Sequence, residues 1–192
     1  PFLISERPCT PGDGIIKLTD KEEDRFLQVF EKAAPAGRIM KFVPASGVAS
    51  RMFQFLQVFN NRSGTLEASE IEAEAKTSSD AEEFLQFIRH IKQFAFYEEL
   101  KSVLARRGTD IDKQVSKGRF KEIVEAILLE QGLNYLNQPK ALIPFHCYPD
   151  HTRTALEEHI AEACHYLGSR SATIHFTVSP EHERSVRQHA EQ

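Results

Sequence analysis

The sequence has no tryptophan, two methionines and three cysteines among its 192 residues. The cysteines, Cys9, Cys147 and Cys164, are odd in number and form no Cys-x-x-Cys pair. This pattern argues against a disulfide framework and against a cysteine-rich zinc site. The sequence therefore predicts reduced, free thiols.

The chain also lacks a long apolar run, a basic-then-apolar leader and any excess of positive charge. No segment approaches the roughly 20 apolar residues that span a bilayer, so no membrane association is expected. The formal net charge is −4, and such a chain has no overall basic field with which to attract a nucleic-acid backbone. We expect a cytoplasmic protein without a nucleic-acid partner.

What is present is ordinary globular material. Hydrophobic residues make up 41% of the chain and charged residues 27%, which is enough to build one real core. We therefore predict one α/β domain over residues 1–192, incomplete if the chain is part of a longer protein. The composition does not indicate an oligomeric state.

The first part of the chain has the pattern of helix, strand and helix. Thr19 and Glu22 form a capping-box pair, and apolar residues then recur at helical spacing, which predicts a helix over residues 20–34. A β-like run over residues 38–43 leads into a loop of small residues, and an apolar helix is expected to begin at Arg51.

Residues 60–137 interrupt this alternation. Residues 60–79 are rich in Glu, Ser, Gly and Thr and have little apolar patterning, so they predict a mobile acidic loop. Two or three amphipathic helices follow it. The segment as a whole is interpreted as a helical insertion in the domain.

The rest of the chain alternates strand and helix. A strand is predicted over residues 141–145, a helix from a second capping-box pair, Thr154 and Glu157, to Leu167, and a strand over residues 172–178, before a terminal helix. Such alternation favours a parallel sheet, with ligands at the carboxyl ends of its strands.

The loop of residues 44–51 has the parts of a phosphate-binding site. Its small residues are Ala45, Ser46, Gly47, Ala49 and Ser50. Gly47 is expected to supply a tight turn and Ser50 to cap the next helix. Arg51 stands at the start of that helix, where the helix dipole disfavours a cation unless an anion is near. The alternative is a simple strand-to-helix turn with a solvated arginine.

Two segments together resemble the signature of sugar-phosphate nucleotidylyltransferases. The first, Ile39 to Met52, ends in the small-residue loop followed by Arg and Met, and the second, Gln138 to Pro144, contains a Pro-Lys-x-Leu sequence. Residues 154–159 and 173–178 are similar to that family's next helix and second strand. The resemblance implies an α/β, parallel-sheet, nucleotide-diphospho-sugar transferase-like (Rossmann-like) fold.

The same resemblance implies roles for individual residues. The nucleotide-binding residues would be Ala45, Ser46, Gly47 and Ser50. Arg51 would contact the triphosphate, and Lys140 would neutralise a phosphate while the sugar phosphate attacks the α-phosphorus. The implied ligands are a nucleoside triphosphate and a sugar phosphate, with Mg²⁺ as cofactor, and no metal ligand is identified.

The chain also resembles a bacterial family of unknown function, through Phe42-Val-Pro-Ala-Ser-Gly47, Ser50-Arg-Met52 and the pair Pro139-Lys140. Three hypotheses therefore stay open. The chain is a nucleotidyltransferase, or a non-catalytic nucleotide- or sugar-phosphate-binding module whose insertion recruits a protein, or a domain in which the loop is only architecture. A Lys140 far from Arg51 would favour the third.

Two other groups of residues are candidate sites: the polar cluster His146, Cys147, Asp150 and His151, and the basic run Lys113, Lys117, Arg119 and Lys121. The first group could ligate zinc, but its spacing fits no standard zinc pattern and a polar loop is the preferred interpretation. The second could form a lid over phosphates, although a solvated helix face explains it more simply.

Overall fold

The computed structural model describes residues 7–167 and 173–191. The helices are α1 (Asp20–Ala33), α2 (Gln54–Asn60), α3 (Ala68–Glu74), α4 (Ser79–Arg89), α5 (Tyr97–Arg106), α6 (Ile111–Ser116), α7 (Lys121–Leu128), α8 (Ala155–Leu167) and α9 (Glu183–Ala190). The strands are β1 (Thr10–Pro11), β2 (Gly14–Ile15), β3 (Met40–Pro44), β4 (Pro144–Cys147), β5 (Thr152–Thr154) and β6 (Thr173–Thr177). Short 3₁₀ turns lie at Ala49–Arg51, Ile91–Gln93, Lys140–Leu142 and Pro180–His182.

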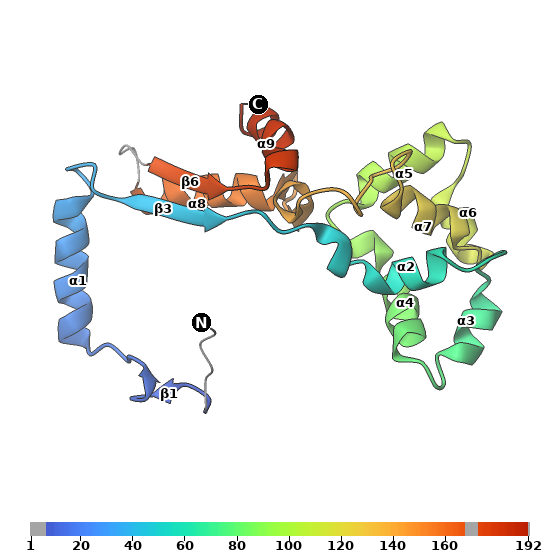
Figure 1. Ribbon diagram of the computed structural model, residues 1–192, viewed down its shortest axis with the longest axis horizontal. Coiled ribbons are helices and arrows are strands. Elements are labelled where there is room, and N and C mark those ends of the chain that lie inside the picture. Colours follow the sequence, from blue (N-terminus) through green and yellow to red (C-terminus); the bar gives the residue numbers. More distant parts are fainter. Residues whose placement is uncertain (1–6, 168–172, 192) are drawn as a thin grey trace.

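The molecule is elongated, and its parts follow one another along the long axis (Figure 1). α1 lies at one end. The helical unit, which we define as residues 53–136, holds α2 to α7 at the other end. β3, β6, α8 and α9 lie between them. The chain is thus a mixed α/β protein, as the sequence predicts.

α1 forms where the sequence predicts it. The Glu22 amide donates to Thr19 Oγ1 over 3.4 Å, and the Thr19 amide donates to the Glu22 carboxylate over 2.9 Å, so the capping box is complete. None of the α1 side chains is buried against the described residues, and Phe26 and Leu27 are exposed. Local capping and helical propensity account for this helix without tertiary packing.

β3 and β6 pair in parallel, from Met40 opposite Thr173 to Pro44 opposite Thr177. α8 lies on one face of this pair, where Lys41 of β3 reaches it. On the opposite face Met40 and Phe42 stay 64% and 62% exposed. The last strand predicted from the sequence is confirmed from Thr173 to Thr177, one residue short of its predicted end, whereas residue 172 lies outside the described residues.

The strand predicted over residues 141–145 is wrong in position and in partner. Residues Lys140–Leu142 form a 3₁₀ turn, and β4 begins at Pro144 and pairs antiparallel with β5. Tyr148 N donates to His151 O over 2.8 Å and closes the hairpin. A hairpin closes a short loop, which costs less chain entropy than a distant pairing. Among the described residues, β3 therefore pairs with a single strand, β6.

The helical unit has its own core. Its largest fully buried side chains include Leu56, Phe59, Phe84, Leu100, Leu104, Ile123, Ile127 and Leu128. These come from α2, α4, α5 and α7, which confirms the amphipathic helices predicted after residue 79. A smaller cluster forms around Leu156, Ala141 and Val186.

The mobile acidic loop predicted over residues 60–79 is wrong in part, because it contains α3. Leu66 and Ile71 are buried in the core of the helical unit and anchor this stretch. Ala68 N also donates to Gly118 O over 2.8 Å. Gly118 has a φ of +67°, and a Cβ there would lie 2.7 Å from the Ala68 Cβ, so this contact requires glycine. Two apolar anchors were too few to show as a sequence pattern.

Candidate phosphate-binding site

The fold brings the two segments of the split signature side by side. The Lys140 amide donates to Gly47 O over 2.9 Å, and the Ala49 amide donates to Gln138 O over 3.1 Å. These bonds form an antiparallel bridge between Val48 and Pro139. The chain leaves the sheet through the first segment, builds the helical unit and returns through the second, so the two segments meet at the carboxyl end of β3 (Figure 1).

A pocket of about 170 Å³ opens at this junction. It is lined by Val43, Pro44, Ala45, Gly47, Lys140, Ala141, Phe145, Ala155, Leu156, His159 and Phe176. We call it the Lys140 pocket. No carboxylate is among its lining residues. Lys140 is half-buried, and its ammonium group makes no ion pair or hydrogen bond with the part of the chain that is described. The charge of the pocket is therefore suited to an anion.

Several backbone N–H groups of the loop beside this pocket have no backbone acceptor within the described part of the chain. Among residues 7–167 and 173–191, the amides of Ser46, Gly47 and Val48 donate to no backbone carbonyl. Ala155 and Leu156, the first residues of α8, line the pocket. The first N–H groups of a helix have no partner within the helix and favour negative charge. Among the first amides of α8, those of Ala155 and Leu156 have no acceptor among the described residues, whereas that of Glu157 is held by Thr154. The loop amides and these two helix amides are the candidate donors to an anion.

The second predicted capping box holds this end of α8 in place. The Thr154 amide donates to the Glu157 carboxylate over 2.6 Å, and the Glu157 amide donates to Thr154 Oγ1 over 3.2 Å. His189 of α9 lies 3.3 Å from Thr154 Oγ1 and the same distance from the Glu157 carboxylate. The start of α8 is thus tied to α9 as well as to its own first turn.

The helix predicted to begin at Arg51 is wrong at its start. Residues Ala49–Arg51 form a 3₁₀ turn, and α2 begins at Gln54 without a side-chain cap. The Ser50 side chain does not cap α2, and the Ser50 carbonyl accepts a hydrogen bond from Gln57 Nε2 over 3.1 Å. The cause is Ala49, which is fully buried and held by Gln138, so the chain must turn before a helix can start. Arg51 is therefore not at the N-terminus of an α-helix.

The predicted site residues separate into two groups. Ala45, Gly47 and Lys140 line the Lys140 pocket, whereas Ser46, Ser50 and Arg51 do not. Gly47 lies in no turn or bend and has no positive φ, and a Cβ there would lie 3.8 Å from Lys140 Cδ, an ordinary contact. The tight turn that we predicted at Gly47 is thus wrong, and this glycine instead leaves space beside the lysine.

The family model described as "Domain of unknown function (DUF4301)" matches residues 1–192. The chain belongs to the DUF4301 family. Neither the curated proteins nor the solved structures provide a significant match. The resemblance to a bacterial family of unknown function is therefore confirmed as membership of an uncharacterised family, and the function of this DUF4301 domain has to be argued from its own residues.

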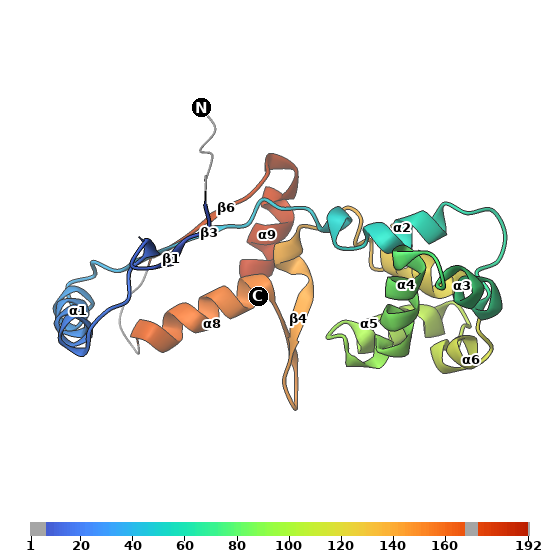
Figure 2. The ribbon, with the colours of Figure 1, turned by 90° about the horizontal axis from the view of Figure 1, so that it is seen from below.

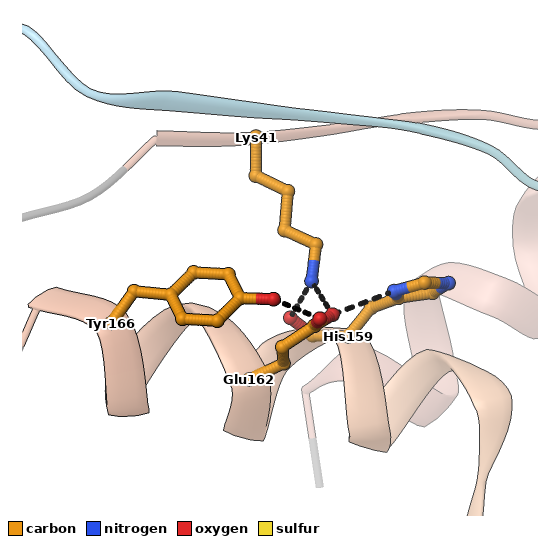
Figure 3. Close-up of polar contacts among 4 residues, drawn as sticks. All are labelled: Lys41, His159, Glu162 and Tyr166. Atoms are coloured by element: carbon orange, nitrogen blue, oxygen red, sulfur yellow. Dashed lines mark hydrogen bonds and ion pairs between the residues drawn. The ribbon is translucent and has the colours of Figure 1, made fainter. Parts of the chain in front are cut away.

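Sequence reasoning missed one polar cluster of the DUF4301 domain, on the sheet side of α8 (Figure 3). Lys41 Nζ donates to His159 O over 3.0 Å and forms an ion pair with Glu162. Tyr166 donates its hydroxyl to Glu162, and His159 Nδ1 lies 3.4 Å from the same carboxylate. The spacing of His159, Glu162 and Tyr166 places them on one helix face, a signal that could have been found.

This cluster has an electrostatic consequence. The hydrogen bonds from Lys41 and then from Tyr166 lower the pKa of Glu162 from its ordinary 4.5 to about 2. Glu162 thus remains a carboxylate over a wide pH range and fixes Lys41 against α8. His159 belongs both to this cluster and to the lining of the Lys140 pocket. The cluster therefore supports one wall of the pocket.

The other sequence candidates have mainly structural contacts. The His146 to His151 segment forms the β4–β5 hairpin, in which Tyr148 stacks on His151 with ring centroids 4.7 Å apart. No group of three or more His, Cys, Asp or Glu residues within the described ranges could hold a metal ion. In the basic run, Lys121 donates to Asn60 O over 2.7 Å and caps the end of α2. No helix among the described residues of this DUF4301 domain is both long and apolar enough for a bilayer.

Proposed function

We propose that this DUF4301 domain binds the phosphates of a nucleotide or sugar phosphate in the Lys140 pocket. The observation that carries the proposal is the half-buried Lys140, which lines a pocket without a carboxylate and has no anionic partner among the described residues. A lysine that lines a pocket without a neighbouring carboxylate leaves its positive charge unbalanced by the protein. A bound phosphate would supply the opposite charge.

The activity that we propose for this site is nucleotidyl transfer to a sugar phosphate. The split signature resembles that of sugar-phosphate nucleotidylyltransferases, and its two segments are hydrogen-bonded to each other. Lys140 would neutralise charge on the phosphate that leaves or is attacked, and the amides of Ser46 to Val48 would hold phosphate oxygens. This chemistry depends on positioning and charge neutralisation.

The proposal includes Mg²⁺ as the ion that accompanies a nucleoside triphosphate. The residues that line the Lys140 pocket include no carboxylate, and no metal-binding group is found among the described residues. They do not fit a protein-held Mg²⁺ site, since such sites use at least one carboxylate. We therefore assign no ligand and derive no step through the ion.

A non-catalytic binding module is the second candidate, because the position of Arg51 counts against transfer; the same position also favours the third hypothesis, a loop that is only architecture. Arg51 is exposed and does not line the Lys140 pocket, so the pocket provides one side-chain cation where transfer would benefit from two. Release of pyrophosphate from a nucleoside triphosphate in the presence of sugar phosphates would establish the enzyme. Binding without release would establish the module.

Calorimetric titration with tripolyphosphate and with each nucleoside triphosphate and Mg²⁺ tests the site. We expect Lys140→Ala to weaken binding about tenfold or more, since a charge-assisted contact contributes about 1.5–3 kcal/mol. Lys101→Ala is the control, because Lys101 is an exposed lysine of the helical unit outside this pocket and outside the basic run. Equal affinities of the Lys140→Ala and Lys101→Ala variants, or no binding by the folded protein, would refute the proposal.

A further inference from the structure

A second pocket is lined in part by Met52 and Pro144, the last residues of the same two segments. Its volume is about 450 Å³, within the range of small-molecule sites. It is lined by Met52, Phe53, Phe55, Glu83, Gln86, Phe87, His90, Gln93, Phe94, Ala95, Phe96, Pro144 and Phe145. We call it the aromatic pocket. Most of its wall comes from the helical unit, and the rest comes from Met52, just before that unit, and from β4, which lies beside it (Figure 2).

The aromatic walls hold one another in place. Phe87 packs against Phe55 and Phe94, with ring centroids 5.5 and 4.8 Å apart. Phe94 in turn stacks on Phe96 at 5.2 Å. Phe145 faces them from β4 and is 43% exposed. A flat ring could therefore enter the pocket without first ordering its walls, which reduces the entropic cost of binding.

The rim of the aromatic pocket is polar but carries no lysine or arginine. Glu83, Gln86 and Gln93 line it, and the side-chain amides of both glutamines make no hydrogen bond within the described ranges. His90 Nδ1 lies 2.8 Å from Gln86 O, which leaves its other nitrogen free of that bond. Such a rim offers both donors and acceptors to the edge of a heteroaromatic ring. It does not offer a charge suited to phosphate.

The two pockets adjoin, because Phe145 lines both. Met52 follows the loop that contains Gly47, and Pro144 follows the turn that begins at Lys140, so each signature segment runs from one pocket into the other. One pocket suits an anion and its neighbour suits a flat polar ring. A nucleotide combines these two chemical groups in one molecule.

We propose that the aromatic pocket receives the base of the nucleotide whose phosphates lie at Lys140. This inference rests on the proposed function and assigns a role to the helical unit, which supplies most of the base-binding wall. Base–aromatic stacking tolerates any base, whereas the glutamines and Glu83 would select among bases. The phosphates and the base would thus be bound by separate residues.

The test compares each nucleoside triphosphate, tripolyphosphate and each free nucleoside by calorimetry. We expect at least one nucleoside triphosphate to bind about fivefold or more tightly than tripolyphosphate, as one stacked base would give. Gln93 and Phe94 line the aromatic pocket and not the Lys140 pocket. Phe94→Leu and Gln93→Ala should therefore remove that preference while leaving tripolyphosphate binding unchanged. Phe26→Ala, an exposed aromatic of α1, should change neither.

The outcomes separate this inference from the proposed function. Equal binding of tripolyphosphate and every nucleoside triphosphate would overturn the base pocket and leave the phosphate site. Nucleoside binding that is lost in Gln93→Ala, without any binding of tripolyphosphate, would keep the base pocket and overturn the phosphate site. Absence of binding by all three ligand classes would overturn both.

Discussion

Lysines of this protein differ in what their ammonium groups contact. Lys41 is paired with Glu162 and with the His159 carbonyl, and Lys121 donates to the end of α2. These two lysines are structural, since each satisfies its charge within the fold. Lys140 has no such contact among the described residues, although it is half-buried. At the residue scale this contrast is the argument for a ligand at Lys140.

The Glu162 carboxylate should make stability depend on acid pH. Its pKa is lowered from 4.5 to about 2 in the folded protein by Lys41 and Tyr166, so its contribution is present above pH 4.5 and is lost as the pH falls toward 2. Glu162→Gln should reduce this acid loss. Thermal unfolding of the wild-type and Glu162→Gln proteins, followed from about pH 7 to about pH 2, measures how much stability each protein loses in acid.

The control for this experiment is Glu130→Gln. Glu130 is exposed and lies outside the ion pairs found among the described residues, so its variant should follow the wild-type profile. A Glu162→Gln profile that stays parallel to the wild-type profile over the whole range would show that the Lys41–Glu162 pair does not contribute to stability in solution.

At the scale of elements, one local motif occurs in two different settings. The capping boxes of α1 and α8 have the same Thr-x-x-Glu chemistry. α1 buries no side chain against the described residues, whereas α8 buries Leu156, Ala163 and Leu167. Tertiary packing therefore couples the second cap, but not the first, to the stability of the fold.

We expect Thr154→Ala to lower the free energy of unfolding by about 1–2 kcal/mol, because a buried N-cap is lost together with its contact to His189. Thr19→Ala, the matched variant of α1, should change it by less than about 0.5 kcal/mol. Urea unfolding followed by circular dichroism measures both. Equal losses in the two variants would mean that α1 is packed in solution as firmly as α8.

At the scale of the whole molecule, the buried side chains are unevenly distributed. The large core belongs to the helical unit, the smaller cluster lies around Leu156, and α1 leaves Phe26, Leu27 and Val29 exposed. Regions with few buried contacts open locally at lower free energy than the rest of a protein. Stability should therefore decrease along the long axis from the helical unit to α1 (Figure 1).

Hydrogen–deuterium exchange by mass spectrometry measures this order directly. We expect the amides of α4, α5 and α7 to exchange most slowly, those of α8 and β3 at intermediate rates, and those of α1 fastest. Protection of α1 equal to that of α7 would contradict the order and would show that another surface covers α1 in solution.

The sequence by itself determined the elements whose causes are local. The capping boxes at Thr19 and Thr154 and the apolar faces of α4, α5 and α7 predicted helices that the structure confirms, because capping and periodicity act over a few residues. The mixed α/β class followed from their alternation with strands. The resemblance of residues 39–52 and 138–144 to one signature could also be recognised in the sequence. The sequence did not predict how close in space the two segments lie.

The tertiary structure decided what depends on residues far apart in the chain. The bond from Ala49 to Gln138 delays α2 to Gln54 and leaves Arg51 outside the Lys140 pocket, and the β4–β5 hairpin keeps β4 from the β3 sheet. The first effect arises from a hydrogen bond between residues far apart in the chain, which competes with local helix propensity. The second arises because a short hairpin competes with pairing to the distant β3, and the periodicity of a strand does not name its partner. The meeting of Gly47 and Lys140, and their adjacency to an aromatic pocket, come from the path of the chain around the helical unit.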